Sequence, residues 1–174
     1  MALKKTLLFL DFANINRAAQ DEGVRIDYAL LKQHIGAGRE LLDAYCYAPL
    51  DPRNEHKYDN VIEELERAGY FVTTKVGAFR NGTYKCNMDI EITIDLIKMA
   101  HVIRPDIMVL ASGDGDFIAV ISELRKMAIR VEVASFKATS SKQLLLKSSA
   151  FIDIGALKGC QLKGIPSKQA DSRA

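Results

Sequence analysis

Carboxylates follow two apolar runs of the sequence, and their types and spacing suit a site for a hard divalent cation. The run Thr6–Leu10 leads directly into Asp11 and, three residues later, Asn14, while the run Ile107–Ala111 leads into Ser112-Gly113-Asp114-Gly115-Asp116. In open α/β sheets, ligands bind beyond the carboxyl ends of the strands, so both groups would meet at one edge of a parallel sheet. Converging carboxylates repel one another unless a cation joins them, and oxygen-only ligation favours Mg²⁺ or Mn²⁺.

Each of these residues also fits a purely structural role. Asp11 suits a helix N-cap or a turn, Asn14 a capping amide, and Asp116 the N-cap of the helix that follows. Gly113 and Gly115 allow backbone conformations that other residues avoid, which would let two carboxylates converge at a tight strand-to-helix turn. A plain turn needs only one carboxylate, so the pair favours a site.

A third acidic group lies at the start of a predicted helix. On that helix Glu91 and Asp95 share one face, whereas Asp89 is turned about 200° away from Glu91. Asp89 either caps the helix or leans into the cleft, and Glu91 and Asp95 also fit solvated surface charges. The predicted metal ligands are therefore Asp11, Asp89, Asp114 and Asp116.

Phosphodiester hydrolysis is the chemistry that such a site favours. Mg²⁺ held by carboxylates lowers the pKa of a bound water and neutralises charge on a phosphate under in-line attack. Asn14 would hydrogen-bond this water or a phosphate oxygen. His34, His56 and His101 have no partner at metal-ligand spacing, and no serine or cysteine lies in a recognised nucleophile elbow, which disfavours zinc sites and acyl transfer.

Short β-rich runs alternate with helical patterns along the chain, which predicts a three-layer, Rossmann-like α/β domain with a mostly parallel sheet of about five strands. The predicted strands are Thr6–Leu10, Leu41–Tyr47, Tyr70–Val76, Ile107–Ala111 and Arg130–Ala134. The predicted helices are Tyr28–Ile35, Tyr58–Ala68, Met88–Val102, Phe117–Met127 and Ser141–Lys147, followed by a last apolar stretch, Phe151–Ile154. Residues 1–154 are predicted to form the domain, and residues 155–174 a flexible basic tail.

Composition excludes several classes of protein. The 174 residues carry 24 Lys and Arg against 22 Asp and Glu, so the chain has too little net positive charge to bind nucleic acid by overall charge alone. Its 48% hydrophobic content is enough for one domain with a hydrophobic core. No export signal is visible in the sequence, and no run approaches the roughly 20 apolar residues of a membrane span, so we expect a cytoplasmic protein. Its three cysteines indicate neither a disulfide framework nor a thiolate zinc site.

Three segments together resemble the NYN domain, in particular its LabA-like members, within the PIN-like nucleases. They are Asp11-Phe12-Ala13-Asn14, the stretch Lys85–Glu91, and Ser112–Phe117, and the resemblance covers about residues 5–154. It implies a PIN-like fold, a divalent metal held by the four aspartates, and endoribonuclease activity. It also assigns Asn14 to the catalytic set and Ser112 to the small hydroxyl position of the strand-end motif, where we expect a substrate contact.

RNA, single-stranded or structured, is the predicted partner, and a local basic patch must bind it. Arg80 and Lys85 are the main candidates, with Lys75 and Lys137 beside them, and Phe79 or Tyr84 could stack a base across a turn at Asn81-Gly82. The same residues also fit the surface charges and packing aromatics of a hairpin.

Two other functions remain compatible with the sequence. A non-catalytic regulatory or nucleic-acid-binding protein would keep the same acidic residues, and a phosphatase would use similar Mg²⁺ chemistry but lacks its usual Asp-x-Asp after the first strand. A homodimer is also compatible with apolar strand edges and helices.

Overall fold

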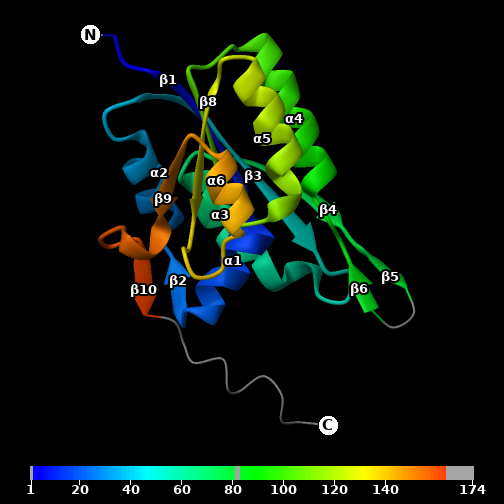
Figure 1. Cartoon of the computed structure of the whole chain (residues 1–174). Coiled ribbons are helices and arrows are strands. Elements are labelled where there is room, and N and C mark those ends of the chain that lie inside the picture. The colour runs from blue at the N-terminus through cyan, green and yellow to red at the C-terminus, as the bar shows by residue number, and fades with distance from the viewer. Residues whose placement is uncertain (1, 81–82, 164–174) are drawn as a thin grey trace.

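A parallel sheet forms the centre of the molecule, as the computed structural model shows for residues 2–80 and 83–163 (Figure 1). Its six strands follow the order β4-β3-β1-β7-β8-β9, and every neighbouring pair is parallel. The strands are β1 (Lys5–Asp11), β3 (Glu40–Leu50), β4 (Phe71–Val76), β7 (Ile107–Ala111), β8 (Arg130–Ser135) and β9 (Ala150–Asp153). The predicted parallel sheet of about five strands is confirmed, and the sixth strand is β9, which the last apolar stretch forms.

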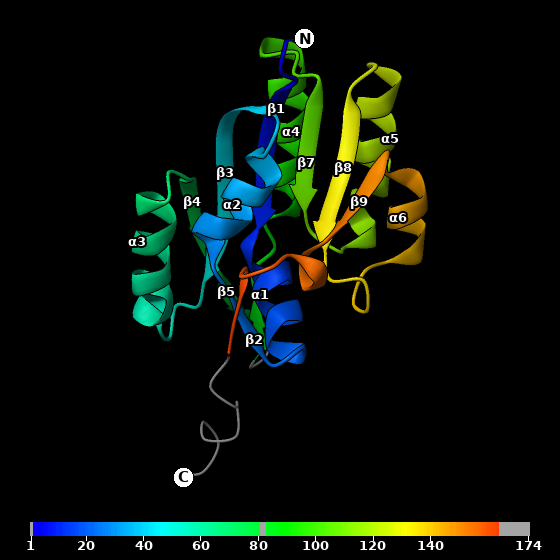
Figure 2. The same ribbon diagram turned by 90° about the vertical axis from the view of Figure 1, so that its left-hand side faces the viewer.

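Helices cover both faces of the sheet, which confirms the predicted three-layer α/β fold (Figure 2). The first three helices pack into the core on one face, and the last three pack into the core on the other. They are α1 (Phe12–Asp21), α2 (Tyr28–Gly36) and α3 (Asp59–Arg67), then α4 (Asp89–Val102), α5 (Ile118–Lys126) and α6 (Lys142–Lys147). Strand β7 is buried along its whole length, as its continuous apolar run requires between two helix layers.

Helix α1 was absent from the sequence prediction, although it starts at a predicted site residue. Its buried residues are Phe12, Ile15, Ala18 and Ala19, and its other face is polar. Asp11 ends β1 and caps α1, since its carboxylate accepts a hydrogen bond from the Asn14 backbone N–H. The capping role foreseen for Asp11 is therefore real, and it fixes where the chain turns from strand to helix.

Two small antiparallel ribbons complete the fold. Strand β5 (Ala78–Arg80) pairs with β6 (Thr83–Lys85), and β2 (Val24–Ile26) pairs with β10 (Gln161–Lys163). Single 3₁₀ turns occur at Glu55–Tyr58, Gly115–Phe117 and Ile154–Ala156 and are labelled η1, η2 and η3.

Residues 155–163 belong to the folded domain, so the prediction of a tail beginning at residue 155 is wrong for this stretch. Cys160 is buried, and its carbonyl accepts a hydrogen bond of 2.8 Å from the Asp27 backbone N–H. Residues 164–174 of the predicted tail lie outside the described residues. Over the described ranges, no helix is both long and apolar enough to cross a membrane.

Candidate functional site

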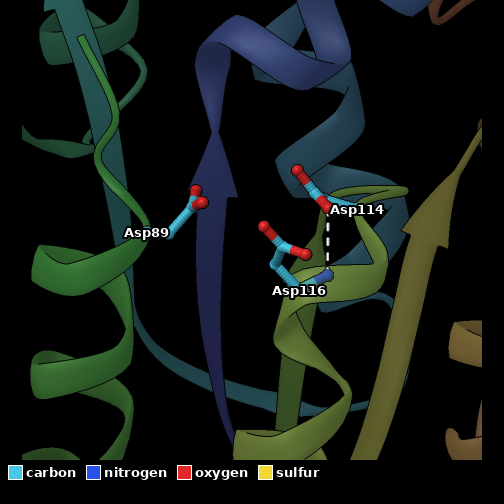
Figure 3. A group of neighbouring side chains, drawn as sticks. All are labelled: Asp89, Asp114 and Asp116. Carbon is cyan, nitrogen blue, oxygen red and sulfur yellow. Dashed lines mark hydrogen bonds between the residues drawn. The ribbon is translucent and has the colours of Figure 1, made fainter.

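Three carboxylates meet at the carboxyl edge of the sheet. Asp89 reaches from the start of α4 toward Asp114 and Asp116, which follow β7 (Figure 3). One oxygen of each carboxylate lies within 4.8 Å of the others. The start of α4 and the segment after β7 are therefore adjacent, so Asp89 leans into the cleft, and the site combines residues far apart in the chain.

The 3₁₀ turn after β7 positions two of these carboxylates. Asp114 caps η2, because its Oδ1 accepts a 3.0 Å hydrogen bond from the Asp116 backbone N–H. The sequence had suggested Asp116 as the cap and Asp114 as the residue that faces the site. Asp114 instead does both, while Asp116 is exposed in the first turn and still belongs to the cluster.

Asn87 orients Asp89 from the other side, a role that the sequence analysis missed. The Asn87 amide Nδ2 donates to Asp89 Oδ2 at 2.6 Å, and the Asp89 backbone N–H donates to Asn87 Oδ1 at 2.6 Å. Burial raises the pKa of the Asp89 carboxyl above its ordinary value, the hydrogen bond from Asn87 opposes this, and the charges of Asp114 and Asp116 add to the rise. The three carboxylates thus repel one another, and a cation at the site would relieve this repulsion.

Asp11 lies beneath the cluster rather than within it. It is 6% exposed and lines the same cavity of about 210 Å³ as Asp89 and Asp114. Its Oδ1 accepts from the Asn14 backbone N–H at 3.2 Å and its Oδ2 from the Ser112 hydroxyl at 3.0 Å. Burial raises the pKa of Asp11 to about 6, against the lowering effect of these hydrogen bonds and with help from the charges of Asp89 and Asp114.

Ser112 and Asn14 connect the two segments that form the site. The Ser112 hydroxyl donates to Asp11 and accepts from the Asp114 backbone N–H at 3.2 Å. Asn14 Oδ1 accepts from the Gly113 backbone N–H at 2.9 Å. Ser112 is completely buried, so its side chain is not accessible for the predicted substrate contact. Its hydroxyl instead links Asp11 to the loop that carries Asp114.

Close packing, and not an unusual backbone angle, explains the glycine at position 113. Neither Gly113 nor Gly115 is among the glycines with positive φ, which corrects the reason given from sequence. A Cβ atom on Gly113 would lie 2.9 Å from Ser135 Oγ and 3.1 Å from Ser140 Cα. The loop before Asp114 therefore fits only a residue without a side chain.

Gly113→Ala is expected to destabilise the protein by about 1–3 kcal/mol and to displace the Asp114 loop, because the added methyl group meets backbone as well as side-chain atoms. Urea unfolding would measure the loss of stability. Gly36→Ala is the matched control, since its Cβ would make an ordinary 3.4 Å contact with Leu41 at the end of a helix. Equal stability of the two variants would contradict the packing argument.

Glu91 and Asp95 make other contacts and do not join the cluster. Glu91 forms a 2.6 Å ion pair with Lys75, whose hydrogen bond holds the pKa of that carboxyl below its usual value. Asp95 accepts a 2.7 Å hydrogen bond from the buried Tyr47 hydroxyl. Lys75, a candidate for the basic patch, is therefore held by Glu91.

The remaining predicted substrate contacts fall on the β5–β6 ribbon. The structure gives the backbone of Arg80 and Lys85, in β5 and β6, while their side chains and those of Phe79 and Tyr84 lie outside the described residues, as does the predicted turn at residues 81–82. Lys137 is exposed in the loop after β8. The roles assigned to these residues stay predictions.

The fold and the site together define a three-layer α/β domain with an acidic cluster at the carboxyl edge of its sheet. The family model described as the NYN domain matches residues 5–155. The chain therefore belongs to the NYN domain family, and the predicted resemblance is confirmed.

Two individual proteins are similar over most of the chain. The low amplitude and bright protein LabA of Synechococcus elongatus is 32% identical over 162 residues, which cover 87% of this chain and 84% of that protein. A crystal structure of a protein of unknown function from Vibrio parahaemolyticus superposes with a TM-score of 0.77 at 24% identity, over 87% of this chain and 93% of that one. The similarity to the Vibrio parahaemolyticus protein supports the fold alone.

Proposed function

We propose that this protein is a Mg²⁺- or Mn²⁺-dependent endoribonuclease that hydrolyses phosphodiester bonds at the acidic cluster. The convergence of Asp89, Asp114 and Asp116 carries the proposal. Membership of the NYN family supports nucleic acid as the substrate. RNA in particular rests on the resemblance to NYN nucleases, and a cytoplasmic location and a homodimer stay predictions.

The donor set fits a hard divalent ion. All three groups are carboxylates, and oxygens bound to one Mg²⁺ at about 2.1 Å lie at most about 4.2 Å apart. The observed limit of 4.8 Å is close to that geometry. Asp89, Asp114 and Asp116 would hold the ion, which when bound activates a water and neutralises charge on the phosphate.

The chain's own residues position this chemistry. Asn87 holds the Asp89 carboxylate in place, and the η2 turn holds Asp114 relative to Asp116. Asp11 adds negative charge at the wall of the same cavity, and each of its oxygens accepts one hydrogen bond within the protein, which leaves a second lone pair on each oxygen. We therefore assign Asp89, Asp114 and Asp116 to direct ligation, keep Asp11 as the fourth proposed carboxylate of the metal site, and assign Asn14 and Ser112 to its support.

Metal removal tests the proposal. RNA incubated with the purified protein should be cut with Mg²⁺ or Mn²⁺ and stay intact in excess EDTA, because the three carboxylates alone provide neither an activated water nor a positive charge. Gel analysis of a labelled RNA would measure this, and the Asp114→Asn variant, purified in parallel, controls for contaminating nucleases. Cleavage in excess EDTA would refute the metal mechanism. Titrated Mn²⁺ binding without any cleavage would instead favour the non-catalytic regulatory alternative.

A further inference from the structure

A second cavity opens directly beside the acidic site. The cavity at the carboxylates, about 210 Å³, and its neighbour, about 260 Å³, share Ala13, Arg17 and Pro49 in their walls. The two cavities therefore lie side by side along α1, and the second one is called the α1 groove. Beyond the acidic site, this α1 groove is lined by Ala13, Arg17 and Gln20 and, opposite them, by Pro49, Lys57 and Tyr58.

The sequence of α1 explains why its wall of the groove is polar. Residues 13, 17 and 20 recur at helical spacing and lie on one face, while Phe12, Ile15 and Ala18 point into the core. Arg17 is exposed and also lines the cavity of Asp89 and Asp114. Arg17 therefore lies between the acidic site and the α1 groove.

Two cations of the α1 groove are available to a ligand. Among the side chains that the structure describes, neither Arg17 nor Lys57 forms an ion pair with a carboxylate. The acidic residue in this part of the groove, Asp51, pairs with Arg53 at 2.6 Å, and its pKa is lowered mainly by Arg53 and to a smaller extent by the charge of Lys57. The groove thus offers positive charge next to a negatively charged metal site.

The rest of the lining suits a nucleotide. Tyr58 is half-buried and packs edge-on against Phe12 with ring centroids 5.1 Å apart, and the Lys57 ammonium lies 5.3 Å from the Tyr58 ring centroid. Asn16 and Gln20 contribute amides that can hydrogen-bond base edges. Cations for phosphates combined with an aromatic surface for unpaired bases are typical of grooves that bind single-stranded nucleic acid.

We infer that the α1 groove binds single-stranded RNA on one side of the bond that lies at the acidic site. Arg17 contacts the phosphate next to that bond, Lys57 contacts a phosphate farther along, and Tyr58 packs against a base or a sugar. A cavity of about 260 Å³ admits one unpaired nucleotide unit, whereas the bases of a duplex are stacked and paired and do not enter it. The position of the cut relative to this strand rests on the proposed nuclease function, but the binding does not.

Binding to a labelled oligouridine RNA, measured by fluorescence anisotropy in the Asp114→Asn background, tests this assignment without cleavage. We expect Arg17→Ala and Lys57→Ala each to weaken binding about tenfold, as the loss of a charge-assisted hydrogen bond requires. Each should also reduce the slope of log affinity against log salt by about 0.7. Lys98→Ala is the matched control, because Lys98 is an exposed cation on α4 that forms no ion pair among the described residues.

The results separate this inference from the proposed function. Weaker binding in the Arg17 and Lys57 variants supports the α1 groove even if wild-type protein cuts no RNA. Three results would each overturn the inference even if cleavage stands. They are no RNA binding by the Asp114→Asn protein, binding by the Arg17 and Lys57 variants within twofold of the Lys98→Ala control, and equally strong binding of a duplex of the same length. Circular dichroism would confirm that both variants fold, which their exposed positions lead us to expect.

Discussion

Asp114→Asn is expected to lower metal-dependent RNA cleavage at least about a hundredfold while leaving the fold intact. Mutation of a residue that only orients a metal ligand lowers metal affinity or activity about 10- to 100-fold. Loss of the charge of a metal ligand itself should therefore lower activity by at least the upper end of that range. The asparagine side chain keeps an oxygen that can accept the hydrogen bond from the Asp116 backbone N–H, so η2 retains its cap. Single-turnover cleavage of a labelled RNA in Mn²⁺ would measure the effect.

Asp153→Asn is the matched control for this substitution. Asp153 ends β9 at the same edge of the sheet and likewise caps a 3₁₀ turn, with its Oδ1 accepting from the Gly155 backbone N–H at 3.0 Å. It is not part of the carboxylate cluster found among the described residues. The control should cut RNA at the wild-type rate. A normal rate in Asp114→Asn, or an equal loss in both variants, would show that cleavage does not depend on the acidic cluster.

The central strands were predictable because burial on both faces leaves a clear trace in sequence. Strands β1 and β7 are nearly continuous apolar runs, and the structure extends or shortens the other predicted strands by only a few residues at either end. Helix α1 was missed because it buries only one narrow stripe and because the polar residues at its start were interpreted as site or turn residues. The pairing of β2 with β10 joins segments more than 130 residues apart, which local patterns do not encode.

The acidic residues were predictable from their position at strand ends, but their division of labour was not. Asp11 looks equivalent to Asp114 in sequence, yet both of its carboxylate oxygens accept hydrogen bonds within the protein, one from Ser112 and one from the start of α1. The hydrogen bond from Ser112 depends on β1 and β7 lying side by side, a contact between residues about a hundred positions apart. Arg17 was missed for a related reason: its place on the same helix as Asn14 becomes visible only once α1 is known.

Asp114→Asn is expected to raise the melting temperature relative to wild-type protein without metal and to lower it relative to wild-type protein when Mn²⁺ is bound. Without metal, we expect the variant to melt above the wild-type protein, because it removes one of the negative charges that raise the pKa values of Asp11 and Asp89. With Mn²⁺ at about 100 times its dissociation constant, wild-type protein gains about 2.7 kcal/mol, or roughly 5–10 °C in a domain of this size. The variant should gain much less, so the order of the two melting temperatures should invert.

Thermal melts in EDTA and in Mn²⁺ would measure this inversion independently of RNA and of cleavage. Asp153→Asn should respond to Mn²⁺ as the wild-type protein does, since its carboxylate lies outside the described cluster. Equal stabilisation of Asp114→Asn by Mn²⁺ would place the ion elsewhere on the protein. A variant that melts below wild-type protein in EDTA would instead show that the Asp114 carboxylate stabilises the protein without a cation, despite its repulsion by Asp89.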